Sequence, residues 1–188
     1  MIVSKKQRSL IEAGYNLFMK FGIKKVTIDD VCAEAKVSKM TFYKYFDNKN
    51  HLIRTMLSEM ISANTKRYEE IIAMETIFAE KIKQMIEMKL NMTNEYSMDF
   101  LKDIYSDPEL FSFLNNYSNE FYVRIRKDFI DAQNRNELSK GVNIDIAFYL
   151  MFKLQDVFKD EAMLSQFDNI TVILDEWLKI ILYGIIKR

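Results

Sequence analysis

The 188-residue sequence has few of the residues that interrupt or cross-link a chain. One Pro and four Gly are too few for a fold of many short strands joined by tight turns, so they favour long helices. Cys32 is the only cysteine, which excludes an intramolecular disulfide and is typical of a reducing compartment. We expect Cys32 in the core. With His51 as the only histidine, a zinc site built on several histidines is excluded.

The sequence also lacks the side-chain combinations on which enzymes depend. One His and one Cys offer little for a nucleophile–base pair, and there is no glycine-rich phosphate loop. Two carboxylate pairs, at 29–30 and 69–70, are interpreted as surface charge. We therefore expect neither an enzyme nor a cofactor or metal site. Without an apolar signal segment or a run of ~18 apolar residues, the chain is expected to be soluble and cytoplasmic, with no membrane partner.

Charge is unevenly distributed along the chain, although the formal net charge is zero. Residues 1–54 contain 11 Lys or Arg and 5 Asp or Glu, a net charge of +6, and the remainder carries −6. A basic N-terminal part on an acidic body indicates a nucleic-acid contact that is confined to one end of the molecule.

Apolar residues recur at helical spacing and predict an all-α fold. Thr27 and Ser38 are expected to cap the second and third helices, and Asp30 gives an approximate capping box at Thr27. We expect helices over about 4–21, 27–35, 38–46, 49–74, 76–94, 98–105, 107–136, 144–159 and 170–187. The predicted domains are a helix-turn-helix domain over 1–48 and a larger helical domain over 49–188.

Residues 27–46 have the anatomy of a helix-turn-helix, with two short helices joined by a tight turn. In the second of them Phe42 and Phe46 are predicted to face inward together with Val37. The outer face then carries Lys39, Met40, Thr41, Tyr43, Lys44 and Tyr45. Aromatic and apolar side chains among lysines are typical of a face that enters a DNA groove, where hydroxyls bond phosphates and apolar atoms meet thymine methyl groups.

The stretch from Arg8 to Leu52 resembles the DNA-binding domain of TetR-type repressors, most specifically in TFYKYF over 41–46 followed by Lys49. The resemblance implies phosphate contacts from Thr27, Tyr43 and Lys49. It implies base contacts from Lys39, Met40, Thr41 and Tyr45. Ser38 and Lys44 complete the predicted DNA-binding set, and the backbone amides beside Lys49 offer a further anion site.

Three positions depart from the family pattern. Lys36 stands where glycine is usual, in a turn that favours a left-handed conformation. A residue with a side chain loses roughly 1–2 kcal/mol in that conformation. Gly14 replaces the usual alanine, and Met40 replaces a small residue on the helix that is expected to read the bases.

The second domain is rich in methionine and aromatic residues over about 76–135, and each of them alone is first interpreted as core. Adaptable side chains of this kind also suit a cavity for apolar ligands. The resemblance implies an inducer site there, and we expect a repressor that an apolar or amphipathic effector releases from DNA. Control by a protein partner is the alternative. The predicted ligand-binding residues are Met85, Met88, Met92, Phe100, Ile104, Phe113, Tyr117 and Phe121.

The C-terminal segment 177–186 contains one charge in ten residues and is apolar nearly all round, as expected for a helix buried on more than one side. We expect a two-fold symmetric homodimer through the last two helices, with its two copies on the half-sites of a palindromic operator. Trp177 could alternatively be a ligand platform. The predicted interface residues are Phe148, Met151, Phe152, Gln155, Trp177, Ile180, Ile181, Tyr183 and Gly184.

Overall fold

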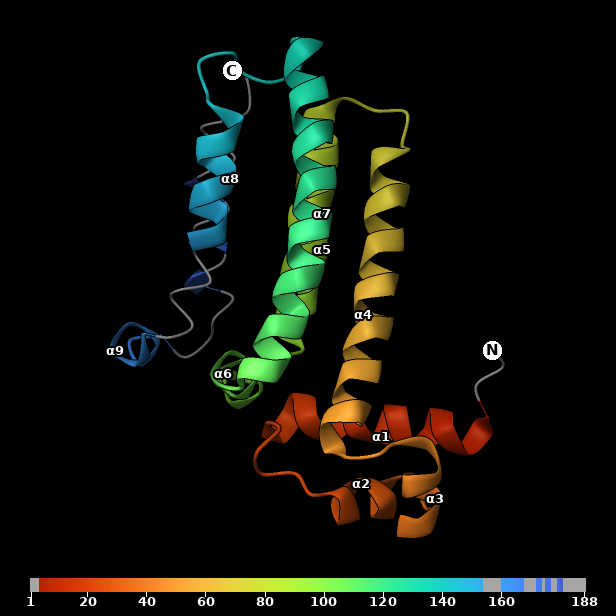
Figure 1. Cartoon of the computed structure of the whole chain (residues 1–188). Helices are drawn as coiled ribbons and strands as arrows, with labels where there is room; N and C mark the ends of the chain where they lie inside the picture. The colour runs from red at the N-terminus through yellow and green to blue at the C-terminus, as the bar shows by residue number, and fades with distance from the viewer. Residues whose placement is uncertain (1–3, 154–159, 168–171, 174, 177–178, 181–188) are drawn as a thin grey trace. The chain divides into compact units, whose positions relative to one another are not determined.

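The computed structural model describes residues 4–153, 160–167, 172–173, 175–176 and 179–180, and it is built from α-helices (Figure 1). The predicted all-α fold is confirmed. The helices are α1 (Lys5–Phe21), α2 (Ile28–Glu34), α3 (Lys39–Tyr45), α4 (Lys49–Ile72), α5 (Phe78–Asn94), α6 (Met98–Ser106), α7 (Pro108–Asn134), α8 (Ile144–Lys153) and α9 (Glu161–Leu164). The sequence had not indicated α9, a single turn.

Local capping signals set where most of these helices begin. The Thr27 hydroxyl accepts from the Asp30 amide, and the Asp30 carboxylate accepts from the Thr27 amide, so the predicted capping box is present. The Ser38 hydroxyl accepts from the Thr41 amide at 3.2 Å, as expected for an N-cap. At the start of α7, the Asp107 carboxylate accepts from two backbone amides.

The chain divides into two compact units. Unit 1 comprises Met1–Asn64 and Glu95–Phe113, and unit 2 comprises Thr65–Asn94 and Leu114–Arg188. Unit 1 is larger than the domain predicted over 1–48, because it also includes the first part of α4 and the whole of α6. The physical reason is that α6 packs against α1, a contact between segments about 80 residues apart that the sequence pattern does not reveal.

Unit 1 is held by a core to which α1 to α4, α6 and the start of α7 contribute. Its most deeply buried side chains include Leu10, Phe18, Val31, Phe42, Phe46, Leu52, Ile53, Met56 and Leu110. Cys32 is also buried, as predicted. A Cβ atom at Gly14 would lie 3.1 Å from Leu52 Cδ2 and 3.2 Å from Phe18 Cε2. Glycine at this position, where the family usually has alanine, therefore fits the close approach of α1 to α4.

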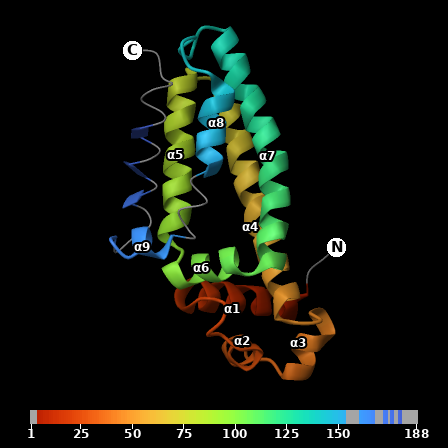
Figure 2. The ribbon, with the colours of Figure 1, turned by 60° about the vertical axis from the view of Figure 1, so that its left-hand side comes forward.

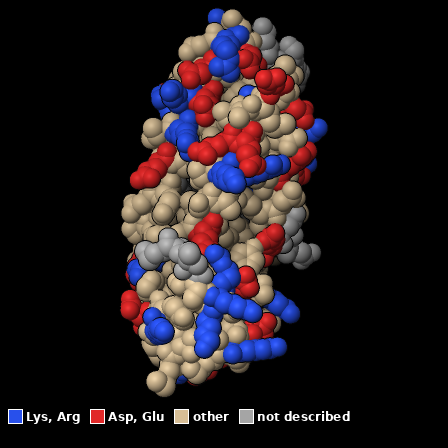
Figure 3. Space-filling view, turned by 90° about the vertical axis from the view of Figure 1, so that its right-hand side faces the viewer, with Lys and Arg blue, Asp and Glu red and all other residues tan. Residues whose placement is uncertain are grey.

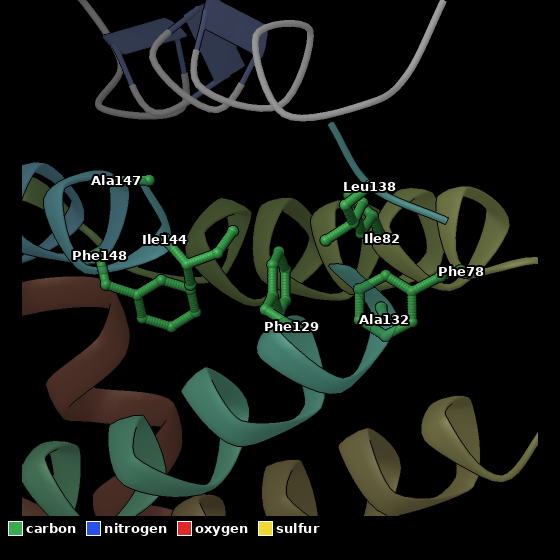
Figure 4. Close-up of a cluster of buried hydrophobic side chains, with 8 residues drawn as sticks. All are labelled: Phe78, Ile82, Phe129, Ala132, Leu138, Ile144, Ala147 and Phe148. Carbon is green, nitrogen blue, oxygen red and sulfur yellow. The ribbon is translucent and has the colours of Figure 1, made fainter. Parts of the chain in front are cut away.

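Unit 2 has its own buried cluster, drawn in Figure 4, at the junction of α5, α7 and α8. Figure 2 shows α8 between α5 and α7. The Phe129 ring packs edge-on against Phe78 and Phe148, with centroid distances of 5.1 and 5.2 Å. Phe148 was predicted in a dimer interface, but it is 4% exposed and belongs to the core of its own unit. The reason is that Phe148 lies on the side of α8 that packs against α5 and α7, so its ring is buried within unit 2.

The C-terminal predictions are only partly covered by the described residues. α8 is described to Lys153, whereas we expected a helix to 159. Gln155, Trp177, Ile181, Tyr183 and Gly184 lie outside the described residues, as does most of the expected helix over 170–187. In the described part of the chain, no helix combines the length and the apolar character that crossing a membrane requires.

Candidate DNA-binding site

The turn between α2 and α3 requires a left-handed residue. Lys36 has a φ of 54°, and the following Val37 amide donates to the Cys32 carbonyl at 3.0 Å. This confirms the conformation that the glycine of the family pattern would adopt more easily. Lys36 holds it at a cost of roughly 1–2 kcal/mol, which the packing of unit 1 as a whole offsets.

The inward face of α3 is formed as predicted. Phe42 and Phe46 are almost completely buried, and their ring centroids lie 5.6 Å apart. The Phe46 ring also meets the His51 ring edge-on at 5.5 Å, which joins the end of α3 to the first turn of α4. These contacts fix the rotation of α3 about its axis, and so determine which side chains point outward.

The outward face of α3 is open. Met40 is 86% exposed and Tyr43 is 52% exposed. Ser38, Lys39 and Lys44 are exposed as well, and the half-buried Thr41 and Tyr45 complete the predicted set. In Figure 3, Lys and Arg side chains gather on the lower part of the visible face, the end at which Figure 1 shows α1, α2 and α3. A short helix with a basic, apolar and hydroxyl-bearing outer face matches the chemistry of a major groove.

Several side chains of this face have partners within the unit. The Lys39 ammonium forms an ion pair with Asp29 at 3.0 Å, which raises the pKa of Lys39 and keeps it charged. The pair is exposed, so Lys39 loses little free energy when it leaves Asp29 to contact an acceptor on DNA. The Ser38 hydroxyl lies 3.0 Å from the Thr41 hydroxyl in addition to its capping bond. A DNA contact from Ser38 stays a prediction.

Lys49 has a structural role that the sequence did not reveal. Its ammonium donates to the Ile23 carbonyl at 2.9 Å and to the Val26 carbonyl at 3.0 Å. These carbonyls belong to the loop between α1 and α2, which leads directly to Thr27. Lys49 has three N–H donors, so one proton is left for a phosphate. Lys49, one predicted phosphate contact, is therefore bonded to the α1–α2 loop that leads to Thr27, another predicted phosphate contact.

Helix α6 holds the same loop. The Asp103 carboxylate accepts from the Lys24 amide at 2.8 Å and lies 3.5 Å from the Lys24 ammonium. One helical turn away, Asp99 pairs with the Lys25 ammonium at 2.5 Å, and this hydrogen bond lowers the pKa of Asp99. Gly22 lets α6 approach closely, since a Cβ atom there would lie 2.8 Å from Asp99 Cβ. The loop that positions α2 is thus anchored by α6.

Sequence reasoning missed Asp99 and Asp103. Each segment by itself shows only a local pattern. Asp99 and Asp103 lie four residues apart on a predicted helix, and Lys24 and Lys25 follow shortly after Gly22. Nothing in a single sequence joins segments that are 74 to 79 residues apart.

The residues predicted to bind a ligand are divided between the two units. Met85, Met88, Met92, Tyr117 and Phe121 belong to unit 2, and Phe100, Ile104 and Phe113 to unit 1. Phe100 and Ile104 are buried in unit 1, with 3% and 2% exposure. Their burial is that of core residues on α6, the helix that packs against α1. The ligand role of the whole set stays a prediction.

An all-helical chain with a basic N-terminal unit and an exposed second helix of a helix-turn-helix has the design of a DNA-binding regulator. Residues 10–56 match the sequence model of the bacterial regulatory proteins of the tetR family. This match assigns the tetR type of DNA-binding region to residues 10–56, which include α2, α3 and parts of α1 and α4.

Individual relatives agree with this assignment. The chain is 35% identical over 60 residues to YdeS, an HTH-type transcriptional regulator of Bacillus subtilis. That match covers 32% of this chain and 29% of YdeS. The regulatory protein TetR from Rhodobacter sphaeroides has a similar fold, with a TM-score of 0.75 and 17% identity over 97% of this chain and all of that one. FadR from Bacillus subtilis, solved with stearoyl-CoA, has a TM-score of 0.73 and 17% identity, over 94% and 98% of the two chains.

Proposed function

We propose that the protein is a transcriptional repressor that binds a palindromic DNA operator as a homodimer and is released by an apolar or amphipathic effector. The observation that carries the DNA-binding part is the outward face of α3. Its N-terminal turn presents Lys39 and Met40, and the buried rings of Phe42 and Phe46 hold the opposite side of the helix in the core. In helix-turn-helix proteins this turn meets the base edges of the major groove.

Phosphate contacts would flank this helix. Thr27 at the start of α2, Tyr43 on α3 and Lys49 at the start of α4 are the proposed contacts. Thr27 and Tyr43 are exposed. Contacts of this kind carry no sequence information, but they set the register of α3 on the duplex. They also release counterions, so affinity should fall steeply with salt.

Replacing Lys49 by alanine tests both of its roles. The loss of a phosphate contact should flatten the slope of log K against log salt by about one unit. The loss of bonds to the Ile23 and Val26 carbonyls should also lower the free energy of unfolding by about 1–3 kcal/mol. Fluorescence anisotropy on an operator duplex at several salt concentrations, together with urea unfolding, measures the two effects.

Lys44→Ala is the matched control. Lys44 is exposed and lies over the Tyr45 ring without bonding to a carbonyl of the α1–α2 loop. It should therefore change DNA affinity and leave stability nearly unaltered. If Lys49→Ala keeps the wild-type salt slope and affinity, Lys49 serves the loop alone and the phosphate assignment is wrong.

The outward face of α8 supports a homodimer. Ile144, Ala147 and Phe148 face the core of unit 2, whereas Ile146, Tyr149 and Leu150 are 59%, 61% and 50% exposed. Ile180 near the end of the chain is 73% exposed. Apolar side chains at this density on one helix face are typical of an interaction surface. A second copy of the chain is the proposed occupant, because one α3 covers only half of a palindromic site.

Leu150→Glu and Ile180→Glu, made separately, should each convert the dimer into monomers. In a symmetric dimer either substitution places one carboxylate from each subunit in the proposed interface. Sedimentation velocity at micromolar concentration measures the change. Val123→Glu is the matched control, since Val123 is equally exposed at 73% but lies on α7, outside the proposed interface. If both variants remain dimers, the subunits pair through another surface. If the wild type is a monomer, the dimer proposal is wrong.

The effector part of the proposal rests on unit 2. Met85, Met88 and Met92 lie half-buried along α5, and Phe121 on α7 packs edge-on against Tyr68 at 5.0 Å. Adaptable methionines beside aromatic rings suit an apolar ligand of variable shape. The similar fold of FadR, which was solved with stearoyl-CoA, gives a first probe.

Long-chain acyl-CoA should weaken operator binding at least tenfold, which corresponds to ~1.4 kcal/mol of differential affinity for the state that does not bind DNA. Met88→Trp should reduce this response while leaving DNA affinity without the probe unchanged, because the added ring fills space beside α5. Operator anisotropy with and without stearoyl-CoA measures both. Tight binding of the probe with no change in operator affinity would refute the coupling for this class of ligand.

A further inference from the structure

A groove of about 320 Å³ lies between α1 and the first part of α4, entirely within unit 1. Its volume is at the lower end of the range for small-molecule sites, roughly 300–1,000 Å³. None of the proposed DNA contacts or the predicted effector residues line it. The lining residues are Arg8, Ile11, Glu12, Tyr15, Asn16, Met56, Glu59 and Met60.

The floor of the groove is apolar. Ile11 and Met56 are 4% and 1% exposed, and Met60 is half-buried beside them. Methionine side chains adjust to ligands of different shape, so this floor can accept an alkyl or aryl group without a precise fit.

The rim of the groove carries an excess of negative charge. The Arg8 guanidinium is neutralised by Glu59, with 2.6 Å between Nη1 and Oε2, across the gap from α1 to α4. Among the described residues, none forms an ion pair or a hydrogen bond with the carboxylate of Glu12. The one cation of the lining is thus already paired, and one carboxylate is left over.

Tyr15, which lies on α1 like Glu12, contributes an aromatic ring to the lining of the groove. Its hydroxyl donates to the Glu95 carboxylate. Burial and this carboxylate together raise the pKa of Tyr15 to about 12. The neighbourhood of the ring is therefore both partly desolvated and negative, which favours a cation over the ring face.

We propose that this groove binds a small organic ammonium ion that bears an apolar group. Glu12 and the Tyr15 ring receive the positive charge, and the apolar group rests on Met56 and Met60. An anionic ligand is disfavoured, because it would have to face Glu12 and take Arg8 from Glu59. The site lies in the unit that carries α3, so its occupant would act on the DNA-binding unit directly.

Benzyltrimethylammonium is a suitable probe, with neopentylbenzene as its uncharged isostere. In the full chain labelled with ¹³C at the methionine methyl groups, the probe should shift the signals of Met56 and Met60 in a saturable way. The Met40 signal, on the exposed face of α3, should not move. The isostere should bind more weakly by at least about twofold, and the probe should raise the melting temperature.

Glu12→Gln should weaken binding of the probe by about two- to fivefold, the range for an exposed charge pair. Glu12 is exposed, so this substitution leaves the fold intact. Glu34→Gln, an exposed carboxylate of the same unit outside the groove, is the matched control and should bind like the wild type. The proposal is overturned if the isostere binds as tightly as the ammonium ion, if Glu12→Gln binds it as tightly as the wild type, or if the Met56 and Met60 signals do not respond. No DNA is present, so the result is independent of the proposed repressor function.

Discussion

Replacing Gly22 by alanine is expected to destabilise unit 1 by about 2–6 kcal/mol. Gly22 has φ 82° and ψ 166°, a conformation that is essentially restricted to glycine and costs other residues about 1–3 kcal/mol. A Cβ atom would also lie 2.8 Å from Asp99 Cβ and 3.0 Å from Asp103 Oδ2. The overpacking adds about 1–3 kcal/mol, because the nearest atom, Asp99 Cβ, is bonded directly to the backbone of α6 and cannot move away by itself.

Gly141→Ala is the control for this substitution. The nearest atom to a Cβ atom there is Ser139 Oγ at 3.7 Å, an ordinary contact, and Gly141 has no left-handed φ. Its urea unfolding curve should match that of the wild type to within about 0.5 kcal/mol. If Gly22→Ala is equally stable, α6 does not hold the α1–α2 loop as the structure indicates.

Replacing Met40 by glutamate is expected to lower operator affinity by at least about 100-fold. Met40 is 86% exposed, so the change leaves the fold intact. In the proposed complex its side chain enters the major groove, where a carboxylate would face the negative potential of the phosphates. Juxtaposed like charges cost several kcal/mol, and a homodimer incurs this cost at two half-sites. Anisotropy titration of an operator duplex measures the loss.

Met40→Gln separates charge from shape. It keeps the length of the side chain and should alter the preferred bases at one or two positions of each half-site, with a smaller loss of affinity. Met40→Glu should also weaken non-specific binding, since phosphate repulsion does not depend on sequence. Wild-type affinity for Met40→Glu would mean that α3 does not enter the groove.

What the sequence predicted well are features with short sequence separation. The capping box at Thr27 and the cap at Ser38 join residues three apart, and the inward Phe42 and Phe46 follow from helical periodicity. The left-handed turn at Lys36 was predicted because the motif around it requires one. All of these are decided within about ten residues of chain, so one sequence contains the necessary information.

What the sequence did not predict depends on long-range packing. Lys49 was expected at a phosphate alone, whereas its ammonium also bonds to carbonyls 23 and 26 residues earlier. Phe148 was expected between two subunits, whereas it is buried in the core of unit 2. Phe100 and Ile104 are buried in unit 1, and their ligand role stays a prediction. An apolar residue at helical spacing has the same pattern in a core, an interface or a ligand site. Only the identity of the packed neighbour distinguishes these cases.

The most direct test is to select duplexes from a random DNA pool with the purified wild-type protein and sequence them. A repressor of the proposed kind should enrich a two-fold symmetric sequence whose half-sites lie about one helical turn, 10–10.5 base pairs, apart. Met40→Gln should enrich half-sites that differ at one or two positions, and Met40→Glu should enrich none. A pool that stays random with the wild type, at a salt concentration where the protein is folded, would contradict sequence-specific DNA binding through α3.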